Sequence, residues 1–416
     1  MSQERAENPQ GSYAFCALCA VSLLCFCNLA IFYGFYNYLE HLDIPHSWRG
    51  PLLSLEPLTA LILRPYLSTR LTLANSVRAM RLGAALAIVA LVSYPFATSV
   101  PTIAAVRVLH GAGYVILASG LMTSFTHFLD PARVAQGFGL LSLTTLLPSA
   151  LMPPFVEAVT PHLPGPGWAY ALAAPLMLPA LLLLAPMGAK ARALAARLPA
   201  GQGERPGWKQ VVLGLRAPGV RGLLLGQLFL ITGSTIVYFF MKSWTLDLGL
   251  GNPGLFFTCS NLSTIAVRVL GMGRLDRLNP GKATGLALLF LAVLTPCFGL
   301  APLFGLEGGQ SALLGMAVLY GLALGLSMPL LNAAMYRVSS GELRAANMNL
   351  LLVALDAGFI LGPIIGGWAL GAGLALPGLF VICGGLMLAA ALFVLPVARR
   401  TPGIRPGIPS GPVALS

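Results

Sequence analysis

The chain has 416 residues, of which 57% are hydrophobic and only 9% are charged, and its formal net charge is +12. A soluble domain carries about 25% charged residues, so this composition excludes a soluble globular protein and indicates an integral membrane protein. The positive charge alone would suit a nucleic-acid partner. We predict none, because the basic residues lie in short loops beside apolar segments, where anionic lipid headgroups attract them.

Twelve apolar segments follow one another along the chain, each close to the about 20 residues that cross a bilayer. Helices are the expected spanning structure, because the segments lack the period-2 alternation of barrel strands. The first segment is too long for the apolar core of a signal peptide, so we expect it to be retained. The predicted spans are 14–39, 50–67, 79–98, 101–125, 134–157, 168–187, 222–243, 254–272, 283–303, 310–336, 345–370 and 375–397.

The longest connection between spans, residues 188–221, divides the chain into two sets of six. It holds seven basic residues and a single acid, Glu204. We therefore predict an N-terminal six-helix bundle over 1–187, this basic cytoplasmic linker over 188–221 and a C-terminal six-helix bundle over 222–398. The Pro- and Gly-rich tail, 399–416, is expected to be cytoplasmic and disordered.

Lys and Arg are distributed unequally between the two sides of this topology. All of them except Arg49, Arg107 and Lys242 lie on the side that also holds both termini. Cytoplasmic loops carry the excess of Lys and Arg, so both termini are predicted to be cytoplasmic. The 21 Arg against 4 Lys are typical of a GC-rich bacterial genome. We expect a multi-pass protein of the bacterial cytoplasmic (inner) membrane.

The seven cysteines all lie inside apolar segments. Cys16 and Cys19 have the spacing of a metal-binding pair, but no second pair or histidine follows at the distance of a zinc site. We predict packing roles for the cysteines and no metal site. The chain also lacks the G-x-x-x-x-G-K-[ST] loop that cradles nucleotide phosphates, so ATP is not the expected energy source and no cofactor is expected.

An internal repeat relates the two halves. Sliding the chain by 204 residues aligns Gly50 with Gly254 and Arg64 with Arg268, and a slide of 210 aligns Pro153 with Pro363. The same offset of 204 aligns Asp43 with Asp247 and Asn75 with Asn279. The matches place equivalent features in spans 2 and 8 and in spans 5 and 11. Two halves related by a parallel repeat are typical of one large group of secondary transporters.

The fourth span contains Arg107-Val-Leu-His110-Gly111-Ala-Gly113. An Arg inside a membrane costs about 2.5–3.5 kcal/mol on insertion scales, so function is the first hypothesis for Arg107. A structural Arg, paired with a carbonyl or carboxylate inside the bundle, is the alternative. Arg107, His110 and Tyr114 share one helix face by their spacing. The two glycines permit close approach of a neighbouring helix.

Two further motifs lie in loops and in span 11. The loop after span 2 runs from Ser68 to Arg78, and its second-half counterpart reads Met272-Gly-Arg-Leu-Asp276-Arg277. Span 11 carries Gly358-Phe-Ile-Leu-Gly362-Pro363-Ile-Ile-Gly366-Gly367. Its glycines permit tight helix packing and its proline bends the helix.

With these motifs the chain resembles the major facilitator superfamily, and within it the twelve-helix efflux branch. The resemblance implies an all-α membrane fold of two pseudo-symmetric six-helix bundles that work by alternating access, with the site between the halves. It also implies gating roles for two groups of residues, in the loops and in span 11. These residues are Arg70, Asp276, Arg277, Gly358, Gly362 and Pro363.

The chain departs from the family pattern at two places. In the first loop the family's Gly and Asp are replaced by Ser68 and Thr72, and a role for Arg70 and Arg78 in topology alone is the alternative. Span 5 has Leu151-Met152-Pro153-Pro154 where antiporters carry the glycine-rich element. This second departure weakens the inference of antiport.

Besides Arg107, the deepest charges are Glu56 in span 2 and Asp356 in span 11. Glu56 lies about as far from the outer face as Arg107 and is the candidate counter-ion. Either acid is a candidate proton carrier, reset by Arg107 or by substrate, and His110 completes the predicted coupling set. The alternatives are helix packing beside Pro57 for Glu56 and a neutral, hydrogen-bonded structural acid for Asp356.

Polar and aromatic residues of spans 1, 4, 7 and 10 are expected to line the pore of this fold. Their mixture suits a lipophilic or amphiphilic organic solute better than a metal ion or a phosphorylated compound. The predicted substrate-binding residues are Asn28, Phe32, Tyr33, Tyr36, Asn37, Tyr114, Gln227, Thr232, Ser234, Tyr238, Tyr320 and Asn332.

We therefore expect proton-coupled export of a small organic molecule by a monomer, with the proton gradient as energy source, and no enzymatic activity. Import or uniport on the same fold stays open, and the degenerate element in span 5 favours it. An integral membrane group-transfer enzyme is a second alternative, for which His41, Asp43 and His46 form the candidate cluster. A solvated loop is the more ordinary explanation of that cluster. A substrate sensor is a third alternative.

Overall fold

The computed structural model describes residues 13–125, 127–128, 134–197, 215–216, 219–249, 251–271, 278–339 and 343–400. All regular structure in these ranges is helical, and it makes twelve passes. The first six passes are α1 (Tyr13–Ala30) with η2 (Ile31–Gly34) and α2 (Phe35–His41), α3 (His46–Arg70), α4 (Leu73–Ser93) with η3 (Tyr94–Phe96), α5 (Val100–Phe125), α6 (Val134–Val159) with η4 (Thr160–His162), and α7 (Trp168–Ala173) with η5 (Ala174–Met177) and α8 (Leu178–Leu183).

The other six passes belong to the second half of the chain. They are α11 (Val220–Asp247), α12 (Gly254–Leu270), α13 (Pro280–Cys297) with η7 (Phe298–Phe304), α14 (Gly305–Val338), α15 (Arg344–Gly371), and α16 (Leu376–Val394) with η8 (Leu395–Arg400). The predicted all-α fold of twelve spans is confirmed.

Within the described ranges, nine helices are long and apolar enough to span a membrane, and α7–α8 together with α9 (Met187–Arg197) form a tenth that is bent by 47°. Two passes remain. Helix α12 is apolar but only 17 residues long, and α3 carries several charged residues and three prolines. Helix α9 occupies the start of the predicted linker. Residues 198–214 of that linker and 401–416 of the predicted tail lie outside the described residues.

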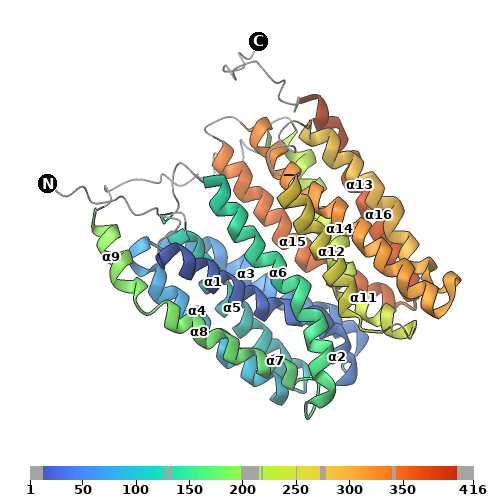
Figure 1. Ribbon diagram of the computed structural model, residues 1–416, viewed down its shortest axis with the longest axis horizontal. Coiled ribbons are helices and arrows are strands. Elements are labelled where there is room, and N and C mark those ends of the chain that lie inside the picture. The colour runs from blue at the N-terminus through green and yellow to red at the C-terminus, as the bar shows by residue number, and fades with distance from the viewer. Residues whose placement is uncertain are drawn as a thin grey trace.

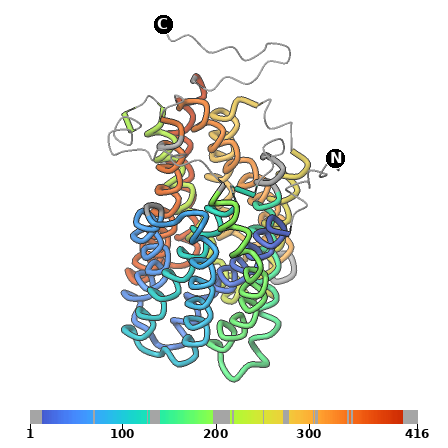
Figure 2. Tube along the Cα trace, turned by 90° about the vertical axis from the view of Figure 1, so that its left-hand side faces the viewer, coloured from blue at the N-terminus to red at the C-terminus, as the bar shows by residue number. Residues whose placement is uncertain are grey.

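The passes gather into two groups. In Figure 1, α1 to α8 lie on one side and α11 to α16 on the other, and Figure 2 shows the same separation between the blue-to-green and the yellow-to-red parts of the chain. The groups meet where α3 packs against α15 and where α6 packs against α12. We call these contacts the α3–α15 seam and the α6–α12 seam.

Twelve passes bring the start of α1 and the end of η8 to the same end of the bundle. We call it the terminal end and the opposite end the distal end. Near the distal end, each seam contains a glycine against a proline. A Cβ atom on Gly50 would lie 2.6 Å from Pro363 O, and one on Gly254 would lie 2.5 Å from Pro153 C. The repeat in the sequence thus becomes a pair of equivalent contacts, because only glycine leaves room for these backbones.

The third pass of each half begins with an asparagine from the repeat. Asn75 Oδ1 accepts from the backbone N–H of Thr72 in a capping box at the start of α4. Asn279 is the N-cap of α13, and its side chain accepts from the backbone N–H of Lys282. Such caps satisfy backbone donors that have no partner within the helix.

Candidate functional site

Arg107 lies inside the N-terminal half and is 2% exposed. Its Nη2 donates to Leu53 O at 2.8 Å and its Nε donates to Leu52 O at 3.2 Å. Pro57 explains the first contact, because a proline inside a helix has no N–H for the carbonyl four residues earlier. In α3 that carbonyl belongs to Leu53, and in a membrane it needs another donor. Arg107 supplies it.

Glu56 is the carboxylate beside this guanidinium. Its Oε2 lies 3.6 Å from Arg107 Nη2, and its side chain is 15% exposed. Gly111 makes the approach of the two helices possible, since a Cβ atom there would lie 2.6 Å from Glu56 O. The geometry places Glu56 where a counter-ion to Arg107 must be, and it also gives Arg107 the carbonyl contacts of a structural arginine.

Aromatic rings and His110 close the other sides of Arg107. The guanidinium carbon lies 5.3 Å from the ring centre of Phe32 and 4.9 Å from that of Phe35. His110 is fully buried, and its Nδ1 lies 3.2 Å from the hydroxyl of Tyr94. These contacts hold Arg107 and His110 within one half, so both move with that half as a unit.

Asp356 belongs to the C-terminal half but pairs with the N-terminal half. Its Oδ2 lies 3.2 Å from Arg64 Nε, and its Oδ1 lies 3.3 Å from Arg64 Nη2. Asp356 is 7% exposed. The Arg107–Glu56 pair lies within the N-terminal half, and the Arg64–Asp356 pair crosses the α3–α15 seam. We call these two ion pairs together the charged network. Arg64 was not among the predicted site residues, although it appeared in the repeat as the partner of Arg268.

A second ion pair between the halves lies toward the distal end. Lys242 of α11 donates to Glu157 Oε1 of α6 at 2.5 Å. Tyr33 donates its hydroxyl to the same carboxylate oxygen. Lys242 also packs against η2, because a Cβ atom on Gly34 would lie 3.0 Å from Lys242 Cδ. Lys242 and Glu157 were not among the predicted site residues. The sign in the sequence was that Lys242 lies apart from the main group of basic residues.

Neutral hydrogen bonds hold the α6–α12 seam. Pro153 and Pro154 deprive Ser149 O and Ala150 O of their donors within α6. Asn261 Nδ2 donates to Ser149 O at 3.2 Å, and Thr258 Oγ1 donates to Ala150 O at 2.6 Å. The carbonyls that the two prolines leave without a helical donor are therefore those that α12 binds.

A family model of the Major Facilitator Superfamily matches residues 18–306 and 223–416. The chain belongs to this superfamily. The superfamily consists of membrane transporters with the parallel repeat described above, so the network and both seams are parts of a transporter. A search of curated proteins found no match.

Solved structures with the same fold are distant in sequence. A bacterial homologue of the human lysosomal transporter Spinster, in an inward-facing and occupied conformation, is 14% identical with a TM-score of 0.67, over 95% of this chain and 97% of that one. A mutant of the peptide transporter POT in complex with sulfate is 15% identical with a TM-score of 0.71, over 94% and 95%. The nucleoside transporter NupG is 15% identical with a TM-score of 0.70, over 92% and 98%. At these identities the likeness shows the fold alone.

Three of the predicted substrate-binding residues contact the other half. Tyr33 joins the Lys242–Glu157 pair. Asn37 Nδ2 donates to Ser243 Oγ at 3.1 Å. Tyr238 donates its hydroxyl to the carbonyls at the end of α1, at 3.3 Å from Ala30 O. All three lie at the contact between the halves, and Tyr33 is fully buried there beside Lys242.

The other predicted substrate-binding residues differ in burial. Tyr114 and Ser234 are half-buried, and Asn332 is exposed. Six more are at most 4% exposed and are enclosed by other side chains. They are Asn28, Phe32, Tyr36, Gln227, Thr232 and Tyr320. A solute can reach these six only after a movement of the helices.

The predicted gating element in α15 is a packing surface. A Cβ atom on Gly358 would lie 2.6 Å from Ile231 Cβ, and one on Gly362 would lie 2.8 Å from Thr232 O. These glycines bring α15 against α11 within the C-terminal half, while Pro363 faces Gly50 across the seam. The element thus contacts both α11 and the α3–α15 seam.

The predicted loop gate is described only in part. Arg70 is exposed, and its guanidinium carbon lies 4.8 Å from the ring centre of Tyr66. Asp276 and Arg277 lie outside the described residues. The loop with His41, Asp43 and His46 is exposed. Among the described residues, no three metal-ligating side chains come together there or elsewhere.

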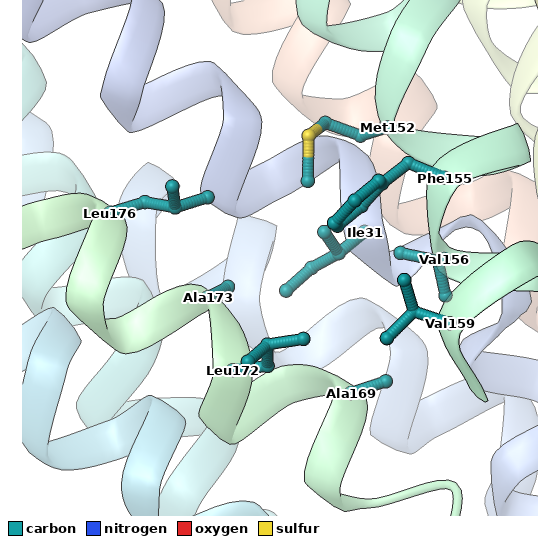
Figure 3. A pocket seen from close by; sticks show the side chains of 9 residues that line it. All are labelled: Ile31, Met152, Phe155, Val156, Val159, Ala169, Leu172, Ala173 and Leu176. Carbon is teal, nitrogen blue, oxygen red and sulfur yellow. The ribbon is translucent and has the colours of Figure 1, made fainter. Parts of the chain in front are cut away.

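An apolar hollow lies within the N-terminal half, away from the charged network. It is lined by side chains of η2, α6, α7 and η5, and Figure 3 shows only carbon and the sulfur of Met152 in these side chains. Without a polar group the hollow cannot orient a polar solute. We therefore place the candidate site at the charged network between the halves.

Proposed function

We propose that this transporter exports a small organic molecule and that inward proton movement drives the export. The observation that carries the proposal is the Arg64–Asp356 ion pair across the α3–α15 seam, beside the buried Arg107–Glu56 pair within the N-terminal half. In alternating access the two halves rock against each other. A step that opens the α3–α15 seam must separate Asp356 from Arg64. A proton on Asp356 removes the charge that holds Arg64 and thereby links protonation to this step.

Glu56 and Arg107 serve as the fixed part of this network. Arg107 is anchored to Leu52 O and Leu53 O, so it does not follow Asp356 when the seam opens. Glu56 remains beside Arg107 as a second carboxylate, held within the N-terminal half. His110, hydrogen-bonded to Tyr94, supports the position of Arg107. Asp356 lies on α15 and moves with the C-terminal half, whereas Glu56 lies on α3 and stays with Arg107 in the N-terminal half.

We place both termini in the bacterial cytoplasm, because the excess of Lys and Arg lies at the terminal end. The distal end then faces outward. The Lys242–Glu157 pair and the Gly50–Pro363 and Gly254–Pro153 contacts all lie toward that end. The described arrangement therefore corresponds to the state that is closed to the outside. Opening to the outside breaks the Lys242–Glu157 pair as well as the two glycine contacts.

The substrate we propose is a lipophilic or amphiphilic organic solute, handled by a monomer in the lipid bilayer without a cofactor. Import or uniport is the second candidate. It is favoured by the Leu151-Met152-Pro153-Pro154 stretch of α6, which lacks the glycines of the antiporter element.

The test is proton flux in proteoliposomes that contain the purified full-length protein, with a pH-sensitive dye, an imposed pH gradient and a panel of organic solutes. Export predicts that a solute on the cytoplasmic side collapses an inward proton gradient. Solute and protons moving in the same direction would replace export by proton-coupled import. Solute movement without any proton flux would replace both by uniport.

A further inference from the structure

Arg268 of α12 is the repeat partner of Arg64, and both lie where their half meets the other one. The offset of 204 residues relates the two arginines. Arg64 reaches from α3 to Asp356 of α15. Arg268 reaches from α12 to Ser142 of α6, to whose hydroxyl its Nη1 donates. The two seams thus present one guanidinium each, from opposite halves.

The partners of the two arginines differ in charge. Arg64 pairs with the carboxylate of Asp356, whereas Arg268 donates to the hydroxyl of Ser142. Nε of Arg268 makes no hydrogen bond, and neither does Nε of Arg64, which lies 3.2 Å from Asp356 Oδ2. No ion pair of Arg268 is present among the described residues. The offset of 210 that relates Pro363 to Pro153 relates Asp356 to Leu146, so the repeat supplies no acid at that position of α6.

The surroundings of Arg268 are polar but neutral. Asn261 and Thr258 lie further along α12 and are occupied by Ser149 O and Ala150 O. The side chain of Arg268 is half-buried. A guanidinium presents five N–H donors in a fork that matches a carboxylate in two parallel hydrogen bonds. Among the described residues no acid pairs with Arg268, so this fork can donate to the carboxylate of a bound solute.

We propose that Arg268 binds the anionic group of the transported solute, so that the substrate is an organic carboxylate with an apolar body. The inference rests on the proposed transport function and specifies its substrate class. The solute's carboxylate takes the position that Asp356 takes at Arg64, and its apolar body lies among the apolar and aromatic side chains between the halves. Each seam then has one cation–anion pair, and in the α6–α12 seam the anion is the cargo.

Binding to the purified full-length protein in detergent tests this proposal without a proton gradient. The probes are a series of aryl and medium-chain carboxylates, each with its neutral amide as a matched control. Wild-type protein is expected to gain thermal stability with carboxylates and not with amides. Arg268→Gln is expected to weaken carboxylate binding at least about tenfold, which corresponds to the loss of about 1.4 kcal/mol. Arg78→Gln, at an exposed arginine of α4, is expected to bind as the wild type does.

Two further variants keep the test informative if Arg268→Gln does not fold. Leu146→Asp places an internal carboxylate at the position equivalent to Asp356 and is expected to weaken carboxylate binding in the same way. Ser142→Ala leaves the guanidinium in place and is expected to retain carboxylate binding. Equal carboxylate binding by wild type, Arg268→Gln and Leu146→Asp would overturn the proposal, and so would the absence of any carboxylate effect on the wild type.

The anionic group could come from a lipid headgroup instead of a solute. The same measurement in mixed micelles with phosphatidylglycerol separates the two sources. An Arg268-dependent gain in stability with phosphatidylglycerol, and none with any carboxylate, would assign Arg268 to a lipid and overturn the proposal. Failure of proton coupling in proteoliposomes would leave the binding result standing, because no gradient enters the binding measurement.

Discussion

The α3–α15 seam and the α6–α12 seam are two copies of one contact that have acquired different chemistry. Both pack a glycine against a proline at the distal end. The first seam carries a charged pair, Arg64 with Asp356. The second is held by neutral hydrogen bonds to carbonyls that Pro153 and Pro154 leave without donors. The two seams thus share their backbone packing but differ in their side chains: an ion pair crosses the first, and hydrogen bonds to backbone carbonyls and from Arg268 to Ser142 cross the second.

The largest effect on transport is expected from a substitution of Arg107. Arg107→Ala leaves Glu56 without its cation and Leu53 O without its donor. We expect active transport to fall to the level of protein-free liposomes. Removal of one partner of a buried ion pair also costs about 3–5 kcal/mol of stability. Solute accumulation and thermal unfolding of the same preparation measure the two effects.

The control for this variant is Arg192→Ala, which removes an exposed arginine of α9. It should accumulate solute as the wild type does. Wild-type accumulation by a folded Arg107→Ala variant would show that the Arg107–Glu56 pair has no part in coupling.

The shared backbone packing is tested by Gly50→Ala and Gly254→Ala. A Cβ atom would lie 2.6 Å from Pro363 O in the first variant and 2.2 Å from Pro154 N in the second. Overpacking of this kind costs about 1–3 kcal/mol, so both variants should open the distal end, and Gly254→Ala should open it more. Spin labels at Asp43 and Asp247, in a background without the native cysteines, report the separation.

Gly315→Ala is the matched control, because nothing lies within 4 Å of a Cβ atom there. Its label distances should equal those of the parent. If both seam variants also kept the parent distances, the glycine–proline contacts would not be what closes the distal end.

The neutral seam is tested by a double-mutant cycle with the smallest expected effect. Asn261→Leu removes the donor to Ser149 O, and a hydrogen bond between membrane helices is worth about 0.6 kcal/mol on average. In Pro153→Ala the new N–H at position 153 satisfies Ser149 O within α6. Asn261→Leu should therefore cost less in that background. Equal costs in both backgrounds, measured by thermal unfolding, would show that the proline does not create this acceptor.

The sequence predicted the helices well because their apolar lengths match a bilayer. The predicted span 2, at 50–67, lies inside α3, which runs from His46 to Arg70. The helix includes Arg49, which is 6% exposed and pairs with Glu40 at 2.8 Å. A charge that is paired inside a bundle looks, by hydropathy alone, like the edge of a span.

A pair of site residues could be predicted from the sequence only where both residues belong to the same six-helix half and lie at the same depth in the membrane. Glu56 and Arg107 lie at similar depths in neighbouring spans, and depth can be read from the sequence. The pairing of Asp356 with Arg64 depends on how α15 crosses α3, which no local pattern encodes. The pairing of Lys242 with Glu157 depends in the same way on how α11 meets α6. The burial of Phe32 and Tyr36 follows from packing around η2, a break in the first pass that periodicity did not reveal.

The central claim is that protonation of Asp356 links the proton gradient to the movement of the halves. Its most direct test compares accumulation and counterflow in proteoliposomes that contain Asp356→Asn, with Asp43→Asn in the exposed distal loop as the control. Asn mimics the protonated acid, so Asp356→Asn should lose proton-driven accumulation and retain downhill exchange, while Asp43→Asn keeps both. Proton-driven accumulation at the wild-type level in Asp356→Asn would contradict the claim.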